Sequence, residues 1–249
     1  MIGRWREYGC GSPVTLVAHG LGATAGEARL PASGLPGTRV VVTFGSHADA
    51  EDAPDGYWDY GVLADELRTV AEKTGARQAI GVSMGAGALV RLAAEDPDRF
   101  TRLALLQPAA LDGSRPQDAA RTMRRLAVAA RAGDATELRR LVRAGLPSCC
   151  GDVGDYVRRR VEALLRLGDA LGVLPDRVPL PAPARDLLTR GSGQVLVVTG
   201  VGDPLHPEAV ATETAAAFPH SRLRVLASSA PLLTHRPQLR ALVQEHLAA

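Results

Sequence analysis

Short apolar runs alternate with amphipathic segments along most of the chain. The runs occupy residues 14–18, 39–44, 77–82, 101–106, 194–199 and 222–226. Most are rich in valine, leucine or isoleucine and end at a glycine, a proline or a polar residue. Continuous rather than alternating apolarity is typical of strands that are covered on both faces, as in a parallel sheet. The pattern therefore predicts buried strands of one mostly parallel sheet.

The segments between these runs have helical spacing. Residues 59–75 repeat apolar positions at helical intervals, with Asp59 placed to cap the start and Gly75 placed to end the helix. Residues 84–95 and 237–247 show similar patterns. A repeated order of strand and helix predicts a doubly wound α/β sheet with right-handed crossovers.

One long segment breaks this alternation. Residues 113–190 carry helical patterns, with a break at Gly133 and Asp134 and a proline-rich stretch, VPLPAPA, near the end. No convincing strand occurs there. We predict that residues 1–112 and 191–249 form the sheet core and that residues 113–190 form a helical cap inserted into it.

Composition excludes several classes of partner. The 29 basic and 27 acidic residues leave a net charge of +2, which gives no reason to expect binding to nucleic acid or to an anionic membrane. The three cysteines have neither the pairing of a disulfide framework nor the spacing of zinc ligands. The first residues lack an apolar stretch of signal-peptide length, and no run is long enough for a membrane span. We therefore expect a cytoplasmic protein that acts on a small molecule without a metal or another cofactor.

The stretch AIGVSMGAGA carries the clearest chemical signal. It places Ser83 between Gly81 and Gly85, after a predicted strand and before a predicted helix. Such a sharp turn strains the serine backbone, exposes its hydroxyl and leaves no room for side chains two residues away. The helix N-terminus adds free amides and a positive dipole. We predict that Ser83 is a nucleophile with an outlying backbone conformation, facing a pocket.

A second stretch, VTLVAHGLGAT, makes the chain resemble the α/β-hydrolase superfamily. In that family a His-Gly turn follows an early strand, and His19 and Gly20 occupy this position here. The resemblance implies that the backbone amides of Leu21 and Met84 form the oxyanion hole. It also implies a structural role for His19.

Two further stretches match the same family. In VLVVTGVGDPLHP, Asp203 follows a late strand, where the family places its catalytic acid. The alternative is that Asp203 only shapes the turn before Pro204. In TFGSHADA, His47 occupies the histidine position of a degraded family turn, and we expect a structural role for it as well.

The catalytic histidine is the departure from the family pattern. The resemblance implies a histidine after the last strand, about six or seven residues before the proline that opens the final helix. Counting back from Pro237 reaches Ala230 or Pro231, and neither can accept a proton. Three alternatives stay open: His235 reaches Ser83 from a rearranged loop, His206 faces Ser83 instead, or no histidine serves. His235 is our first expectation, because it follows the last strand.

These observations favour a serine hydrolase that cleaves a small to medium apolar ester, thioester or lactone. The alternatives are a ligand-binding protein that has lost the base, and a lyase or cyclase on the same scaffold. The inserted helices are expected to form a lid over Ser83. Candidates for its apolar wall are Leu138, Leu141, Leu146, Leu164 and Leu171.

Overall fold

The computed structural model describes residues 4–113, 116–150, 153–168, 170–181 and 184–248. Within them one seven-stranded sheet has the order β1-β3-β2-β4-β5-β6-β7. The strands are β1 (Arg4–Tyr8), β2 (Val14–Ala18), β3 (Thr38–Thr43), β4 (Gln78–Val82), β5 (Arg102–Leu106), β6 (Gln194–Gly200) and β7 (Ser221–Leu226). The six predicted strands are confirmed as β2 to β7, with ends that differ by one residue at most.

Strand β1 was not predicted. It pairs antiparallel with β3 at the edge of the sheet, whereas all other neighbouring strands run parallel. Its sequence, RWREY, is largely exposed. An edge strand of this kind buries too little surface to leave the continuous apolar pattern of the central strands.

The central strands bury both faces. In β2, Leu16 belongs to the core cluster on one side of the sheet and Val17 to the cluster on the other. The same alternation occurs in β6 between Val197 and Val198. This two-sided burial is the physical reason for the continuous apolar runs in the sequence.

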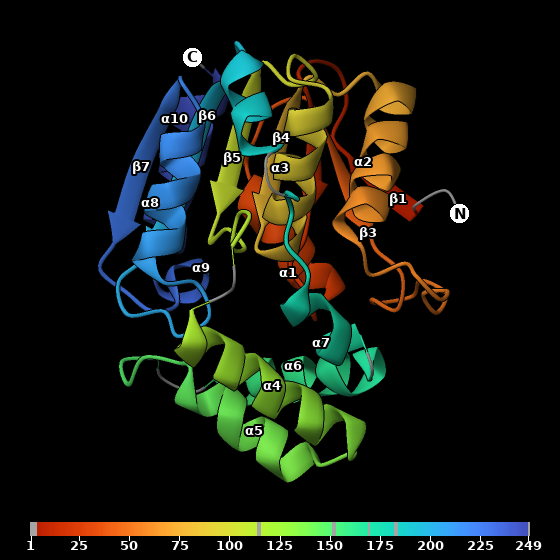
Figure 1. The fold of residues 1–249 in the computed structure, drawn as a ribbon, viewed down its shortest axis with the longest axis vertical. Helices are drawn as coiled ribbons and strands as arrows, with labels where there is room; N and C mark the ends of the chain where they lie inside the picture. The colour runs from red at the N-terminus through yellow and green to blue at the C-terminus, as the bar shows by residue number, and fades with distance from the viewer. Residues whose placement is uncertain (1–3, 114–115, 151–152, 169, 182–183, 249) are drawn as a thin grey trace.

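Helices cover the two faces of the sheet. Figure 1 shows α2, α3 and α8 in front of it, with α10 and α1 behind. These helices are α1 (Ala25–Arg29), α2 (Tyr60–Thr74), α3 (Met84–Glu95), α8 (Glu208–Ala217) and α10 (Arg236–Ala248). Three 3₁₀ turns, η1 (Leu30–Ala32), η2 (Leu174–Asp176) and η3 (Ala184–Arg190), and the short helix α9 (Pro231–Thr234) complete the connections. The layers form a doubly wound α/β fold, as predicted.

The predicted ends of α2 are confirmed. The side chain of Asp59 accepts a hydrogen bond from the Gly61 amide at the N-terminus, and Gly75 ends the helix with a φ of 70°. Glycine adopts this left-handed conformation at little cost. Neither α1 nor α8, which are short, was predicted from the sequence.

The chain between β5 and β6 is helical. Its helices are α4 (Gln117–Arg131), α5 (Ala135–Ala144), α6 (Gly154–Leu167) and α7 (Ala170–Val173). Asp134 caps α5 at the predicted break by accepting from the amides of Thr136 and Glu137. Figure 1 shows these four helices together beyond one end of the sheet. The division into a core and a cap at residues 113 and 190 stays a prediction.

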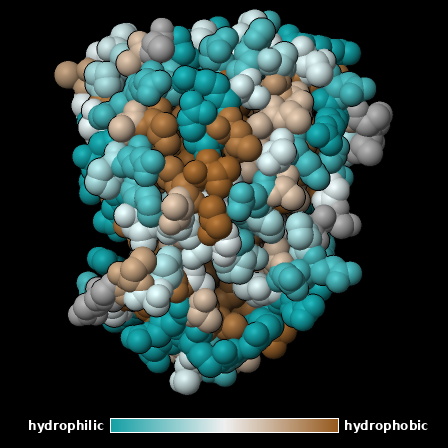
Figure 2. Space-filling view, turned by 90° about the vertical axis from the view of Figure 1, so that its left-hand side faces the viewer, coloured by the Kyte–Doolittle hydropathy of each residue, from teal (hydrophilic) through white to brown (hydrophobic). Residues whose placement is uncertain are grey.

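The opposite edge of the sheet is formed by β7. Figure 2 faces this side of the molecule and shows an apolar area surrounded by hydrophilic residues. Arg222 and Arg224 are exposed on β7 itself, and charged side chains on an edge strand oppose pairing with another chain. Among the helices that the structure describes, none is both long and apolar enough to cross a bilayer.

Candidate active site

Ser83 lies at the junction between β4 and α3. Its φ of 49° and ψ of −108° fall in a region that costs a residue with a side chain roughly 1–3 kcal/mol. The Ser83 amide donates to the carbonyl of Leu106 on β5 (3.0 Å), and the Gly87 amide donates to the carbonyl of Ser83 (2.9 Å). The serine also lines a cavity. The predicted strained turn with its serine facing a pocket is therefore confirmed.

The two glycines of the turn are required by close backbone contacts. A Cβ atom on Gly81 would lie 2.6 Å from the Ala86 Cα, and one on Gly85 would lie 2.3 Å from the carbonyl oxygen of Ala18. Both distances are far below van der Waals contact. The Gly85 amide donates to the carbonyl of His19 (3.1 Å), which joins the start of α3 to the end of β2.

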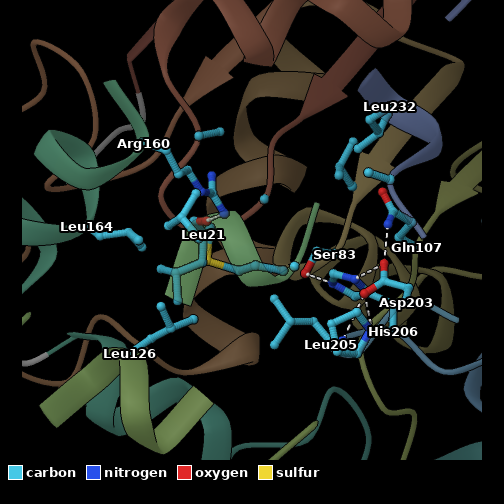
Figure 3. Close-up of a pocket in the computed structure, with 18 of the residues that line it drawn as sticks. Leu21, Ser83, Gln107, Leu126, Arg160, Leu164, Asp203, Leu205, His206 and Leu232 are labelled. Carbon is cyan, nitrogen blue, oxygen red and sulfur yellow. Dashed lines mark hydrogen bonds and ion pairs between the residues drawn. The ribbon is translucent and has the colours of Figure 1, made fainter. Parts of the chain in front are cut away.

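A continuous chain of hydrogen bonds links Ser83 to the loop after β6. The Nε2 atom of His206 lies 2.8 Å from the Ser83 Oγ, and its Nδ1 lies 2.9 Å from the Asp203 Oδ2. Figure 3 shows the imidazole between the serine and the carboxylate. This geometry lets the ring accept the serine proton at Nε2 while Nδ1–H donates to Asp203.

Asp203 is held by its own turn. Its Oδ1 accepts hydrogen bonds from the backbone amides of Leu205 (2.8 Å) and His206 (3.1 Å). Burial alone would raise the pKa of Asp203, but the adjacent His206 and these hydrogen bonds outweigh burial and lower that pKa below its usual value. The group is therefore a carboxylate at neutral pH, as an acid partner of histidine requires.

His235 does not reach the serine, and the first expectation for the base is wrong in the structure. Its Nδ1 lies 2.8 Å from the Thr234 Oγ1, and its carbonyl accepts from the Leu239 amide (2.8 Å) at the start of α10. The short helix α9 follows the last strand, and His235 ends it. Its side chain is not part of the cavity wall. The alternative residue, His206, lies beside Ser83.

The loop after β2 is fixed by two buried histidines. His47 accepts a hydrogen bond from the Gly22 amide at Nε2 (2.9 Å) and contacts the Gly45 carbonyl through Nδ1 (2.8 Å). His19 accepts from the Phe44 amide (3.2 Å), and its Nδ1 lies 2.9 Å from the Gly20 carbonyl. Both rings are therefore neutral, with the proton on Nδ1. This is the arrangement expected of structural histidines.

The amides of Leu21 and Met84 are available for a ligand. Met84 is the first residue of α3, and Leu21 lies in the loop that His47 holds. Within the described ranges neither amide donates to a protein group. Both residues line the same cavity as Ser83. Their role as the donors of an oxyanion hole stays a proposal.

Acid should destabilise the protein through two buried histidines, His19 and His246. Burial lowers the pKa of His19 from 6.5 to about 4, and burial lowers the pKa of His246, on α10, to about 4 as well. As the pH falls, these imidazoles are protonated in the unfolded chain at a higher pH than in the folded protein. Their contribution to the free energy of unfolding is therefore fully present above pH 6.5 and is lost towards pH 4. Each residue should contribute about 3 kcal/mol to that loss.

The measurement is the free energy of unfolding in urea between pH 7 and pH 5, where most carboxylates are still ionised. The decline should be smaller in His246→Gln and unchanged in His220→Gln, because His220 is exposed. A free energy that does not change over this interval would contradict the neutral state of the buried histidines.

The cavity at Ser83 has a volume of about 350 Å³. One side is formed by the loops after β2, β4, β5 and β6, and the other by the helices between β5 and β6. Its apolar wall includes Leu21, Met84, Met123, Leu126, Leu141, Leu146, Leu164, Leu171, Leu205, Leu232 and Leu233. Four of the five predicted leucines are present. The exception is Leu138, which is fully buried in the core instead.

Gln107 and Arg160 are among the polar residues of the cavity that were not predicted from the sequence. Gln107 follows β5 and donates its side-chain amide to Asp203, and Arg160 on α6 donates to the carbonyl of Leu21 (3.0 Å). Gln107 had a signal, because a polar residue directly after a buried strand marks the edge where active sites form. Arg160 had none, since it is one of several arginines on its helix.

Metal ligands do not gather at this site. Among the described residues no three histidine, cysteine, aspartate or glutamate side chains converge as a metal ion would need. The groups that do converge are a hydroxyl, an imidazole and a carboxylate, and the cavity beside them is also lined by Leu21 and Met84, whose amides have no protein partner among the described residues. This set is capable of nucleophilic attack on a carbonyl group.

No protein-family model matches the chain, and no curated protein sequence matches it significantly. Solved structures, in contrast, match nearly the whole chain. An esterase from Exiguobacterium antarcticum matches with a TM-score of 0.81 at 17% identity, covering 99% of this chain and 96% of the other. The enol-lactonase from Burkholderia xenovorans LB400 has the same TM-score and coverage at 21% identity. A non-heme bromoperoxidase named BpoC from Mycobacterium tuberculosis H37Rv, described as putative, has a TM-score of 0.79 at 19% identity, covering 100% and 97%. With its sheet order, strained serine turn and inserted helices, the chain has the α/β-hydrolase fold.

Proposed function

We propose that the protein is a serine hydrolase that cleaves small to medium apolar esters, thioesters or lactones through an acyl-enzyme on Ser83. The observation that carries this proposal is the hydrogen-bond chain from Ser83 through His206 to Asp203, open to an apolar cavity. The first alternative, a binding protein that has lost its base, is disfavoured because His206 lies beside Ser83, and turnover decides between hydrolysis and the lyase or cyclase alternative. The position of His206 favours hydrolysis.

Each step of the reaction has a residue in reach. Ser83 attacks the substrate carbonyl, and His206 takes the hydroxyl proton at Nε2. Asp203 holds the ring and stabilises its positive charge, while the amides of Leu21 and Met84 bind the oxyanion. Collapse of the tetrahedral intermediate breaks the bond to the leaving group, which takes the proton from His206. Water then attacks the acyl-enzyme, with His206 as base again, and releases the acid and Ser83.

The cavity supports the substrate class. A volume of about 350 Å³ lies within the range of small-molecule sites. Its wall is dominated by leucine and methionine side chains, which favour an apolar acyl chain. The structural neighbours described as an esterase and an enol-lactonase act on the same bond type. We therefore expect acyl groups of short to medium length.

The test is hydrolysis of p-nitrophenyl esters of increasing acyl length, a thioester and a simple lactone. We expect kcat/KM to pass through a maximum with acyl length, and Ser83→Ala to remove the activity with unchanged folding by circular dichroism. Absence of turnover with every substrate, or activity that survives in Ser83→Ala, would overturn the proposal.

Arg160, on α6, contacts the loop after β2 that contains Leu21, called the oxyanion loop below. Its guanidinium donates to the carbonyl of Leu21, the residue whose amide faces the substrate. Hydrogen bonds to charged groups contribute about 1.5–3 kcal/mol. Arg160→Ala should therefore lower kcat/KM by about 10- to 100-fold.

Arg158 provides the matched control on the same helix. It pairs with Asp155 and Glu162 on the outer surface, so Arg158→Ala should keep the original kcat/KM. Equal effects of the two substitutions would show that Arg160 does not act through the oxyanion loop.

A further inference from the structure

Gln107 is a buried polar residue at a strained position beside the triad. It follows β5 directly and has a φ of 46°, a conformation that residues other than glycine rarely adopt. Its backbone amide donates to the carbonyl of Val198 on β6 (2.7 Å), and the residue is only 7% exposed. The strained backbone and the strand hydrogen bond fix the point from which its side chain extends.

The side chain of Gln107 extends to the catalytic loop. Its Nε2 donates to the Oδ2 of Asp203, which is the oxygen that also accepts from His206. The partner defines the orientation of the amide, because a carboxylate oxygen repels the amide oxygen and attracts the NH₂ group. Figure 3 shows Gln107 above Asp203, with the His206 ring and Ser83 to one side of the carboxylate.

With this contact every acceptor position of Asp203 is used. The Oδ1 accepts two backbone amides, and the Oδ2 accepts Gln107 and His206. Two donors on one oxygen share its negative charge, so each bond is weaker than it would be alone. The amide of Gln107 therefore limits how strongly Asp203 attracts the protonated form of the His206 ring.

We propose that Gln107 is a positioning residue that orients Asp203 and competes with His206 for the same carboxylate oxygen, Oδ2. This inference rests on the proposed function for its catalytic consequence, but the contact itself can be tested without turnover. Removal of the amide should strengthen the bond between Asp203 and His206 and keep the ring protonated to higher pH.

The test is an NMR titration of the His206 ring, whose signal is assigned by its loss in His206→Gln. Gln107→Met keeps the length of the side chain and removes the donor. Gln107→Asn keeps the amide but is too short to reach, and asparagine tolerates positive φ, so this variant guards against a folding defect. Both should shift the His206 titration midpoint upward by about 0.5–1 pH unit.

A pocket residue that does not touch the triad provides the control. Thr122 lines the same cavity, and its hydroxyl donates to the backbone carbonyl of Asp118 within α4, so Thr122→Val should leave the midpoint unchanged. In the active enzyme the acid limb of kcat/KM should move with the NMR midpoint in both Gln107 variants.

An unchanged midpoint in both folded variants would overturn the inference. Absence of turnover in the unmodified protein would instead contradict the proposed function and leave the titration result valid.

Discussion

Replacing His206 by alanine is expected to lower kcat by about 10,000-fold or more, because no other base lies in reach of Ser83 among the described residues. The distance of 2.8 Å between Nε2 and Oγ already places the ring for proton transfer. Folding should be nearly unaffected, since the side chain is part of a cavity wall and not of the core. The measurement is kcat on the best ester, with circular dichroism as the check on structure.

His235→Ala is the matched control. Its ring is bonded to the neighbouring Thr234 and does not line the cavity, so turnover should remain close to that of the unmodified protein. If His235→Ala were inactive and His206→Ala active, the assignment of the base would be reversed. That outcome would require the loop after β7 to rearrange in solution.

Gly85→Ala is expected to be among the most destabilising single substitutions in the chain. The added methyl group would lie 2.3 Å from the Ala18 oxygen and 2.7 Å from the His19 oxygen. Both obstacles are backbone atoms of a buried strand end and cannot move aside as a flexible side chain would. Overpacking of a dense core costs about 1–3 kcal/mol, and we expect at least the upper end of this range in urea unfolding.

Gly113→Ala is the control for adding a methyl group to a glycine where there is room for it. Apart from its neighbours in the chain, no atom of the described residues lies within 4 Å of the position that its Cβ would take, so its unfolding free energy should change little. Equal stability of the two variants would mean that the turn at Ser83 is looser than the structure indicates.

The serine turn was predictable from local sequence because its requirements are local. Gly81 and Gly85 must be glycines because the strand and helix meet there at backbone contact distance, and Ser83 lies between them within five residues. The buried strands were equally visible, because burial on two faces demands continuous apolar runs. Asp59 and Gly75 marked the ends of α2 because helix capping also depends on residues next to one another in the chain.

The base could not be assigned from local sequence. The family pattern favoured a histidine after the last strand, and only the folded chain shows that His206 meets Ser83 across 123 positions. A local signal did exist: Asp203 and His206 are three residues apart, and the aspartate accepts the amides of its own turn. Gln107 joins them from another strand, a contact that depends on the order of β5 and β6 in the sheet.

The measurement that tests the central claim most directly is labelling with a fluorophosphonate probe, followed by mass spectrometry of the intact protein and its peptides. A serine activated by His206 should form one adduct, located on Ser83. The adduct should be absent in Ser83→Ala and form far more slowly in His206→Ala, with both variants folded. An unlabelled Ser83 in the folded, unmodified protein would contradict the claim that it is the nucleophile.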